Sequence, residues 1–211
     1  VHSILNALTS RCFYKKWMAA PSQGRFGFCL SRSRLSNCLN DKHMSFCDWR
    51  FISRARLALT PVNASNHSGL SKMCRKCGAE LESLAHVLNH CRVHSAFWRK
   101  RHDGVQTLLC DQLKSRYPQA ILSVDKKFEH ASSVSGGDLR PDVLLELPLE
   151  KKVFIVDVKC TIDTTSAWES AAILTKTKYQ PIADYYKMNG YTTVTLCNFV
   201  VSSLGSFCPS N

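Results

Sequence analysis

The feature that most constrains the fold of this sequence is a cysteine–histidine array at residues 74–91. Two residues separate Cys74 from Cys77, eight more lead to His86, and a further four lead to Cys91. Thiolate and imidazole groups at such spacings are typical of a tetrahedral structural zinc site. Four ligands leave no open position on the metal, so the array predicts a small module that folds around Zn²⁺.

The identity of the fourth zinc ligand has two alternatives, His90 and the weaker candidate His94. His90 lies four residues after His86, on the same face of a helix, and competes with Cys91 for the metal. Cys91 can bind only if that helix ends just before it. Apolar residues at helical spacing support a helix between the two ligand pairs, namely Leu81, Leu84, Ala85 and Leu88.

Positive charge is concentrated in the first half of the chain. Residues 1–101 carry 17 basic and 4 acidic side chains, whereas residues 102–211 carry 11 and 12. This asymmetry predicts a nucleic-acid partner, and a solvated basic surface without a partner is the alternative. The candidate nucleic-acid contacts are Arg50, Arg54, Arg56, Arg75, Lys76, Arg92, Lys100 and Arg101. The first three are expected to lie off the apolar face of a helix over residues 46–59.

Composition excludes several classes of protein. Of the 211 residues, 45% are apolar and 21% charged, which excludes wholesale disorder. No apolar run approaches the roughly 20 residues of a membrane span, and the first 20 residues do not resemble a secretory signal. We therefore expect an intracellular protein with reduced cysteines and no membrane partner. The start at Val1 rather than at Met indicates a piece of a longer protein.

The second half of the chain has the pattern of an α/β core. After helical pieces over residues 1–60, we expect a short helix at 105–113 and a strand within 120–130. Two apolar strands follow at 143–145 and 153–158, and then a helix over 167–179. Pro181 is expected to open a further helix, capped at Gly190, before a last strand at 191–201.

Two aspartates mark the apolar strands. If these strands form a hairpin that turns between Leu149 and Glu150, opposed residue numbers sum to 299, which is also the sum for Asp142 and Asp157. The two carboxylates should then face each other on one side of the sheet, about 5.5 Å apart at Cβ. Lys159 is two residues after Asp157, so it should share that face.

A pair of carboxylates with a lysine suits phosphodiester chemistry. Mg²⁺ or Mn²⁺ prefers oxygen ligands, and the lysine can neutralise developing charge. Asp111 and Glu129 are candidates for an additional metal ligand. The structural alternative is a simple salt bridge between Asp157 and Lys159, which leaves Asp142 unexplained.

These features together resemble the carboxy-terminal region of site-specific, type-1 non-LTR retrotransposon polyproteins. Pro141-Asp142 with Asp157-Val158-Lys159 resembles the PD-(D/E)xK core of restriction-like nucleases. The array followed by Arg101-His102, and the basic stretch 49–57, are similar to the zinc knuckle and upstream linker of that family. Residues 175–179 resemble its lysine–tyrosine motif, which implies that Lys178 and Tyr179 are catalytic.

The resemblance covers roughly residues 10–200 and implies the fold class. We expect an α/β protein with a restriction-endonuclease-like PD-(D/E)xK core, preceded by a basic helical linker and a small zinc knuckle. The expected domains are the linker (1–71), the CCHC zinc knuckle (72–104), the endonuclease domain (105–205) and a tail (206–211). Many family members lack a lysine after the second carboxylate, whereas this chain has both Lys159 and the downstream pair Lys176 and Lys178, so the catalytic lysine stays open.

The resemblance also implies a function. We expect a nuclear, metal-dependent DNA endonuclease that nicks double-stranded target DNA, so that the released 3′-hydroxyl primes reverse transcription. The reverse transcriptase would be another domain of the polyprotein, because this chain has no aspartate-pair polymerase motif, and element RNA is a further partner. One alternative is a catalytically inactive, zinc-dependent nucleic-acid-binding module from a decayed or domesticated element. Another is a repair or junction-resolving nuclease.

Overall fold

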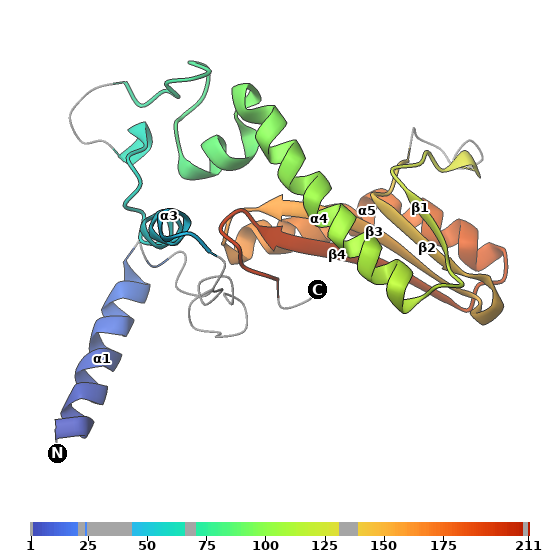
Figure 1. Cartoon of the computed structure of the whole chain (residues 1–211), viewed down its shortest axis with the longest axis horizontal. Helices are drawn as coiled ribbons and strands as arrows, with labels where there is room; N and C mark the ends of the chain where they lie inside the picture. Colours follow the sequence, from blue (N-terminus) through green and yellow to red (C-terminus); the bar gives the residue numbers. More distant parts are fainter. Residues whose placement is uncertain (1, 21–23, 25–43, 66–70, 131–138, 209–210) are drawn as a thin grey trace. The chain divides into compact units, whose positions relative to one another are not determined.

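The computed structural model describes the chain except residues 1, 21–23, 25–43, 66–70, 131–138 and 209–210 (Figure 1). It divides into two compact units. The N-terminal unit contains residues 1–94 together with two short later segments, 162–165 and 202–207. The sheet unit contains residues 95–161, 166–201 and 208–211. None of the helices in the described part of the chain is long and apolar enough to cross a membrane.

In its described residues, the N-terminal unit contains helix α1, His2–Ala19, helix α3, Phe46–Arg56, and a loop-rich segment. Ser45 caps α3 by accepting a hydrogen bond from the Asp48 amide, as expected for a serine at this position. The loop-rich segment contains a 3₁₀ turn at Asn63–Ser65, a π-helical turn at His86–His90 and a 3₁₀ turn at Arg92–His94.

Two short segments from late in the sequence complete the core of the N-terminal unit. Ala55 of α3 and Leu204 are both fully buried and pack together. Half-buried side chains surround them, namely Ile52, Leu84, Leu88 and Ile162. The apolar stripe predicted before Cys91 therefore packs Leu84 and Leu88 against this core, both half-buried, whereas Leu81 remains about half exposed.

Arg56 does not belong to the nucleic-acid surface predicted for it. Its side chain is only 1% exposed, and its Nε lies 3.1 Å from the Asp163 carboxylate. Its Nη2 donates to the Leu204 carbonyl at 2.9 Å and to the Ser206 hydroxyl at 2.7 Å. Burial of a charge is costly unless it is paired. The Arg56 guanidinium therefore links α3 to the segment at Asp163 and to the segment 204–206.

The sheet unit contains a four-stranded mixed sheet with the order β1-β2-β3-β4. Helix α4, Ser95–Arg116, precedes β1, Ile121–Val124. Strands β2, Val143–Leu147, and β3, Lys152–Thr161, form a hairpin through a 3₁₀ turn at Pro148–Glu150. Helix α5, Thr165–Met188, then leads to β4, Thr193–Ser202, which runs in the same direction as β3 (Figure 1).

The predicted hairpin register is confirmed. Val143 pairs with Val156, and the pairing continues to Leu147 with Lys152, so every pair sums to 299. Because strand side chains alternate between the two faces of the sheet, this register determines whether a side chain of the hairpin packs against α4 or against α5. Val143 and Val156 pack with Cys110 of α4, whereas Val153 and Ile155 pack with Tyr179 and other residues of α5. Figure 1 accordingly shows α4 and α5 on opposite faces of the sheet.

Two predicted helix boundaries in this unit were wrong. Helix α5 is continuous through Pro181, although proline removes one helical hydrogen bond, because Tyr179, Ile182 and Ala183 are buried on both sides of it. Helix α4 is much longer than 105–113 and contains Gly104, whose cost of about 1 kcal/mol is small against 22 helical residues. Strand β1 ends at Val124, since Asp125 takes a left-handed φ of 50°.

We expect Arg56→Met to destabilise the protein by about 3–5 kcal/mol, because it leaves the buried Asp163 carboxylate without its cation. Arg54→Met is the matched control, since Arg54 is exposed on the same helix. Urea denaturation measures both. The double variant Arg56→Met/Asp163→Leu should recover most of the loss, and an Arg56→Met variant as stable as the wild type would contradict the buried pair.

Candidate functional site

The four residues of the cysteine–histidine array converge in the N-terminal unit. The ligand atoms of Cys74, Cys77, His86 and Cys91 all lie within 4.8 Å of one another. Cys74 Sγ is 3.9 Å from Cys91 Sγ, and Cys77 Sγ is 3.4 Å from His86 Nε2. Tetrahedral zinc with bonds of about 2.3 Å to sulfur and 2.0 Å to nitrogen requires separations of roughly 3.5–3.8 Å. The cluster could therefore bind a metal ion such as zinc.

The surroundings of the cluster favour metal binding. Hydrogen bonds from the Cys77 and Lys76 backbone outweigh burial and lower the pKa of the Cys74 thiol to about 6, which favours the thiolate that zinc requires. His86 Nδ1 lies 3.0 Å from a carboxylate oxygen of Glu80, so Nε2 faces the sulfur atoms. A carboxylate behind a ligating histidine is a common means of fixing the ring and its tautomer.

The structure selects Cys91 over His90 as the fourth member of the cluster. The Cys91 amide donates to the His86 carbonyl at 2.7 Å, and Cys91 itself is extended, with φ −67° and ψ 116°. The helical turn thus ends at His90, as binding through Cys91 requires. Cys91 is completely buried, whereas His90 is exposed.

Glu82 ties the array to the segment before it. Its buried carboxylate accepts hydrogen bonds from the Arg75 amide at 2.6 Å, from Arg75 Nη2 at 2.6 Å and from the Asn63 amide at 3.0 Å. The Arg75 hydrogen bonds lower the pKa of Glu82 to about 2. Arg75, predicted to contact nucleic acid, therefore has its charge balanced within the module, although half of its side chain remains exposed.

Most of the other predicted nucleic-acid contacts are available on the surface. Exposed basic side chains come from α3, from the array and from α4, namely Arg50, Arg54, Lys76, Arg92 and Lys100, and Arg101 is half-buried. Two aromatic residues of α3 are also exposed. Phe46 and Trp49 stack with their ring centroids 6.1 Å apart, on the helix that carries Arg50 and Arg54.

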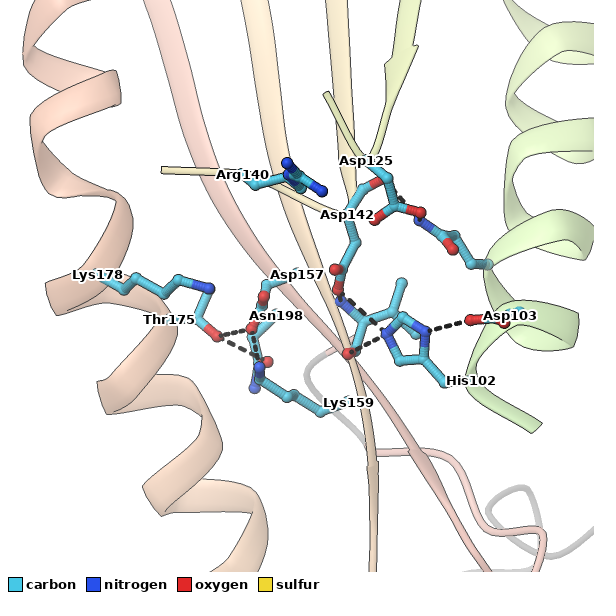
Figure 2. Close-up of polar contacts among 12 residues, drawn as sticks. His102, Asp103, Asp125, Arg140, Asp142, Asp157, Lys159, Thr175, Lys178 and Asn198 are labelled. Carbon is cyan, nitrogen blue, oxygen red and sulfur yellow. Dashed lines mark hydrogen bonds and ion pairs between the residues drawn. The ribbon is translucent and has the colours of Figure 1, made fainter. Parts of the chain in front are cut away.

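In the sheet unit, Asp157 of β3 is the centre of a buried polar cluster (Figure 2). The carboxylate is 1% exposed and accepts a hydrogen bond from Thr175 Oγ1 at 2.8 Å and from the Tyr179 hydroxyl at 3.1 Å. Burial raises the pKa of Tyr179, so its hydroxyl remains a donor. Lys159 Nζ lies 2.7 Å from Asp157 Oδ2. Three groups of β3 and α5 thus contact the Asp157 carboxylate directly.

Both candidate lysines reach this cluster. Lys159 contacts Asp157 directly, whereas Lys178 Nζ donates to the Tyr179 hydroxyl at 2.7 Å and lies 4.5 Å from the centre of that ring. Tyr179 therefore connects Lys178 to Asp157. Figure 2 shows the two lysines approaching from β3 and from α5.

Asp142 takes different partners from Asp157, although its position continues the register of the hairpin. It precedes β2, and its Oδ2 accepts a hydrogen bond from the Val158 amide at 2.6 Å. The same oxygen is 3.4 Å from His102 Nε2 of α4, which is also 3.2 Å from the Val158 carbonyl (Figure 2). Asp157 thus has its partners on β3 and α5, whereas Asp142 contacts β3 and α4.

His102 shows that these oxygens stabilise a cation. Its hydrogen bond with Asp142 outweighs burial and raises the pKa of His102 to about 9, so the imidazole is positively charged at neutral pH. The donors around it, a carboxylate and a backbone carbonyl, are hard oxygen ligands of the type that Mg²⁺ prefers.

Asp125 and His102 are polar neighbours of Asp142 that were not predicted from the sequence. Gln106 Nε2 donates to Asp125 Oδ2 at 3.0 Å and to the Asp142 carbonyl at 2.8 Å, so Asp125 lies beside Asp142. Asp111 and Glu129, proposed instead, are exposed. The signal for Asp125 is its place directly after β1, the neighbour of β2, which brings it to the same edge as Asp142.

No protein-family model matches this chain, and no curated protein matches it either.

We expect the purified protein to contain about one zinc ion per chain, and Cys91→Ser to lose it, because three ligands cannot close the tetrahedron. His90→Ala and Cys47→Ser are the controls, since both residues are exposed and lie outside the cluster. Metal analysis after dialysis gives the readout. Loss of zinc in His90→Ala with full zinc in Cys91→Ser would reverse the ligand assignment.

Proposed function

We propose that this chain is a metal-dependent DNA endonuclease with a restriction-like PD-(D/E)xK core, from the carboxy-terminal region of a non-LTR retrotransposon polyprotein. One observation carries the proposal. Adjacent antiparallel strands bring Asp142 and Asp157 to one end of the hairpin, and Lys159 lies 2.7 Å from Asp157. Two carboxylates and a lysine at such a position can support metal-assisted hydrolysis of a phosphodiester.

In this proposal Asp142 and Asp157 hold Mg²⁺ or Mn²⁺, which when bound polarises the phosphodiester and lowers the pKa of a water molecule. Thr175 and Tyr179 orient Asp157 through their hydrogen bonds. Lys159 or Lys178 neutralises the charge that develops on the attacked phosphate. Lys159 is the closer of the two to a carboxylate, since Lys178 reaches Asp157 only through Tyr179.

The basic N-terminal half is proposed to hold double-stranded target DNA. Arg50, Arg54, Lys76, Arg92 and Lys100 are exposed and supply positive charge without a buried partner, unlike Arg56. The zinc module would present part of this surface. In the polyprotein, the nick would prime reverse transcription of element RNA by another domain, which places the reaction in the nucleus.

The second candidate function is a nucleic-acid-binding module that has no nuclease activity. The observation in its favour is that groups of the chain itself compensate both carboxylates, with Lys159 on Asp157 and His102 on Asp142. Such pairs also arise where the aspartates serve only to stabilise the fold. Nicking of supercoiled plasmid DNA with Mg²⁺ or Mn²⁺ separates the two candidates.

We expect Asp142→Asn and Asp157→Asn each to reduce plasmid nicking by about 100-fold or more, since each removes a charge from the proposed metal site. Asparagine keeps an oxygen that accepts from Val158 or Thr175, so the fold should persist. Asp184→Asn is the control, because Asp184 is an exposed aspartate of α5. Full activity of Asp157→Asn would end the nuclease proposal.

The lysines make a separate prediction. Lys159→Ala should slow nicking by about 100-fold, as for loss of an electrostatic stabiliser, while Lys178→Ala should be mild. DNA binding measured alongside should change little in either variant. The reverse ranking would assign the role to Lys178, and full nicking by the double variant would remove lysine from the mechanism.

DNA affinity should fall linearly with salt on logarithmic axes, because basic side chains release counterions from the phosphates. Arg50→Gln/Arg54→Gln should weaken binding and lower the slope by about 0.9 per lost contact. Lys187→Gln is the control, an exposed lysine of the sheet unit. Fluorescence anisotropy over a salt series measures the slope, and an unchanged slope in the double variant would exclude α3 from the DNA surface.

A further inference from the structure

The sheet unit contains a cavity of about 430 Å³ that the proposed chemistry does not use. Its wall includes the end of α5, the segment 126–130 and the start of β2. The volume lies in the range of small-molecule sites. Its lining is mainly polar and aromatic.

Five aromatic rings along this cavity form an unbroken series of contacts. His130 stacks on Tyr185 with centroids 4.7 Å apart and planes at 10°, and Tyr185 is 5.2 Å from Phe128. Tyr186 lies 5.6 Å from Tyr185 and 4.9 Å from Tyr191. His130 is exposed and Tyr185 half-buried, so part of this aromatic wall is open to solvent. Stacking on such rings is the usual way in which proteins hold an unpaired nucleobase.

Glu146 supplies a hydrogen-bond acceptor in the same cavity. Its half-buried carboxylate accepts from the Tyr191 hydroxyl at 3.4 Å and from the Tyr186 hydroxyl. Burial, and secondarily Glu146, raises the pKa of both tyrosines, so both remain donors that hold the carboxylate in place. A carboxylate has about four acceptor positions and can take a further donor. The amino group of cytosine is the base donor that carboxylates typically accept from.

The cavity lies beside the proposed cleavage centre. Pro141 lines the cavity, and the next residue is Asp142. Consecutive Cα atoms are about 3.8 Å apart, close to the rise of about 3.4 Å per nucleotide along one DNA strand. Lys126 and Lys127 also line the cavity, which places positive charge where a phosphate backbone would pass. Glu129 is a second carboxylate in the lining, so the cavity as a whole is not strongly basic.

We propose that this cavity is a nucleobase subsite, which takes one unstacked base, preferably cytosine, from the strand at the cleavage centre. The aromatic wall supplies the stacking surface, Glu146 reads the amino group, and Lys126 and Lys127 hold the neighbouring phosphate. The position of the subsite relative to the cut rests on the proposed nuclease function. The binding of a base does not.

The test measures binding of fluorescein-labelled single-stranded decamers of dC and dT to the full chain, without Mg²⁺ or Mn²⁺. The wild type should prefer dC. Tyr185→Leu should weaken both by about 10-fold, since it removes a stacking ring. Glu146→Gln should abolish the preference for dC, because the amide can turn either its carbonyl or its amino group toward the base. Tyr117→Leu, a tyrosine outside this cavity, should bind as the wild type does.

A photochemical measurement keeps the test independent of folding in the variants. A dC decamer that contains 5-iodo-2′-deoxycytidine, irradiated with the wild-type protein, should form adducts at His130, Tyr185 or Tyr186. Adducts confined to other residues, or Tyr185→Leu and Glu146→Gln binding both decamers as the wild type does, would overturn the subsite. Absence of plasmid nicking by the wild type would instead overturn the nuclease proposal and leave these binding results unaffected.

Discussion

The antiparallel pairing of β2 with β3 is the constraint on which the sheet unit depends. Side chains alternate along a strand, so a shift by one residue would exchange the two faces of the sheet. The observed register turns Val153, Ile155 and Asp157 toward α5. The apolar residues of this set bury themselves against Tyr179 and Ile182, and that packing carries Asp157 to the hydroxyls of Thr175 and Tyr179. The polar cluster is therefore a consequence of hydrophobic alternation in the strand before it.

Much of this hairpin could be predicted from the sequence, because both strands are short apolar runs joined by a turn that begins with Pro148. The same holds for the metal cluster, whose ligands are separated by only a few residues. Local patterns of this kind require no knowledge of distant contacts. The side-chain partners of Asp142 could not be predicted, since they depend on where α4 crosses the sheet and on a strand that begins one residue later, at Val143.

The failures at Arg56 and Pro181 have a similar origin. An arginine on a basic helix is normally exposed, and only the packing of residues 163, 204 and 206 against α3 buries this one. A proline normally ends a helix, yet the apolar contacts of Ile182 and Ala183 outweigh the lost hydrogen bond. Tertiary contacts with residues far away in the sequence determine both the burial of Arg56 and the continuation of α5 through Pro181. A local sequence pattern cannot predict such contacts.

The buried contacts of Arg56 with Asp163, Leu204 and Ser206 make the N-terminal unit discontinuous in sequence. The residues that close it come from the chain immediately before α5 and immediately after β4. During synthesis on the ribosome, α3 and the metal cluster would therefore emerge well before Asp163 and Ser206, and the Arg56 guanidinium would stay in water until residue 206 had been made. Folding of this unit could be completed only after translation of the sheet unit, so the two would mature together.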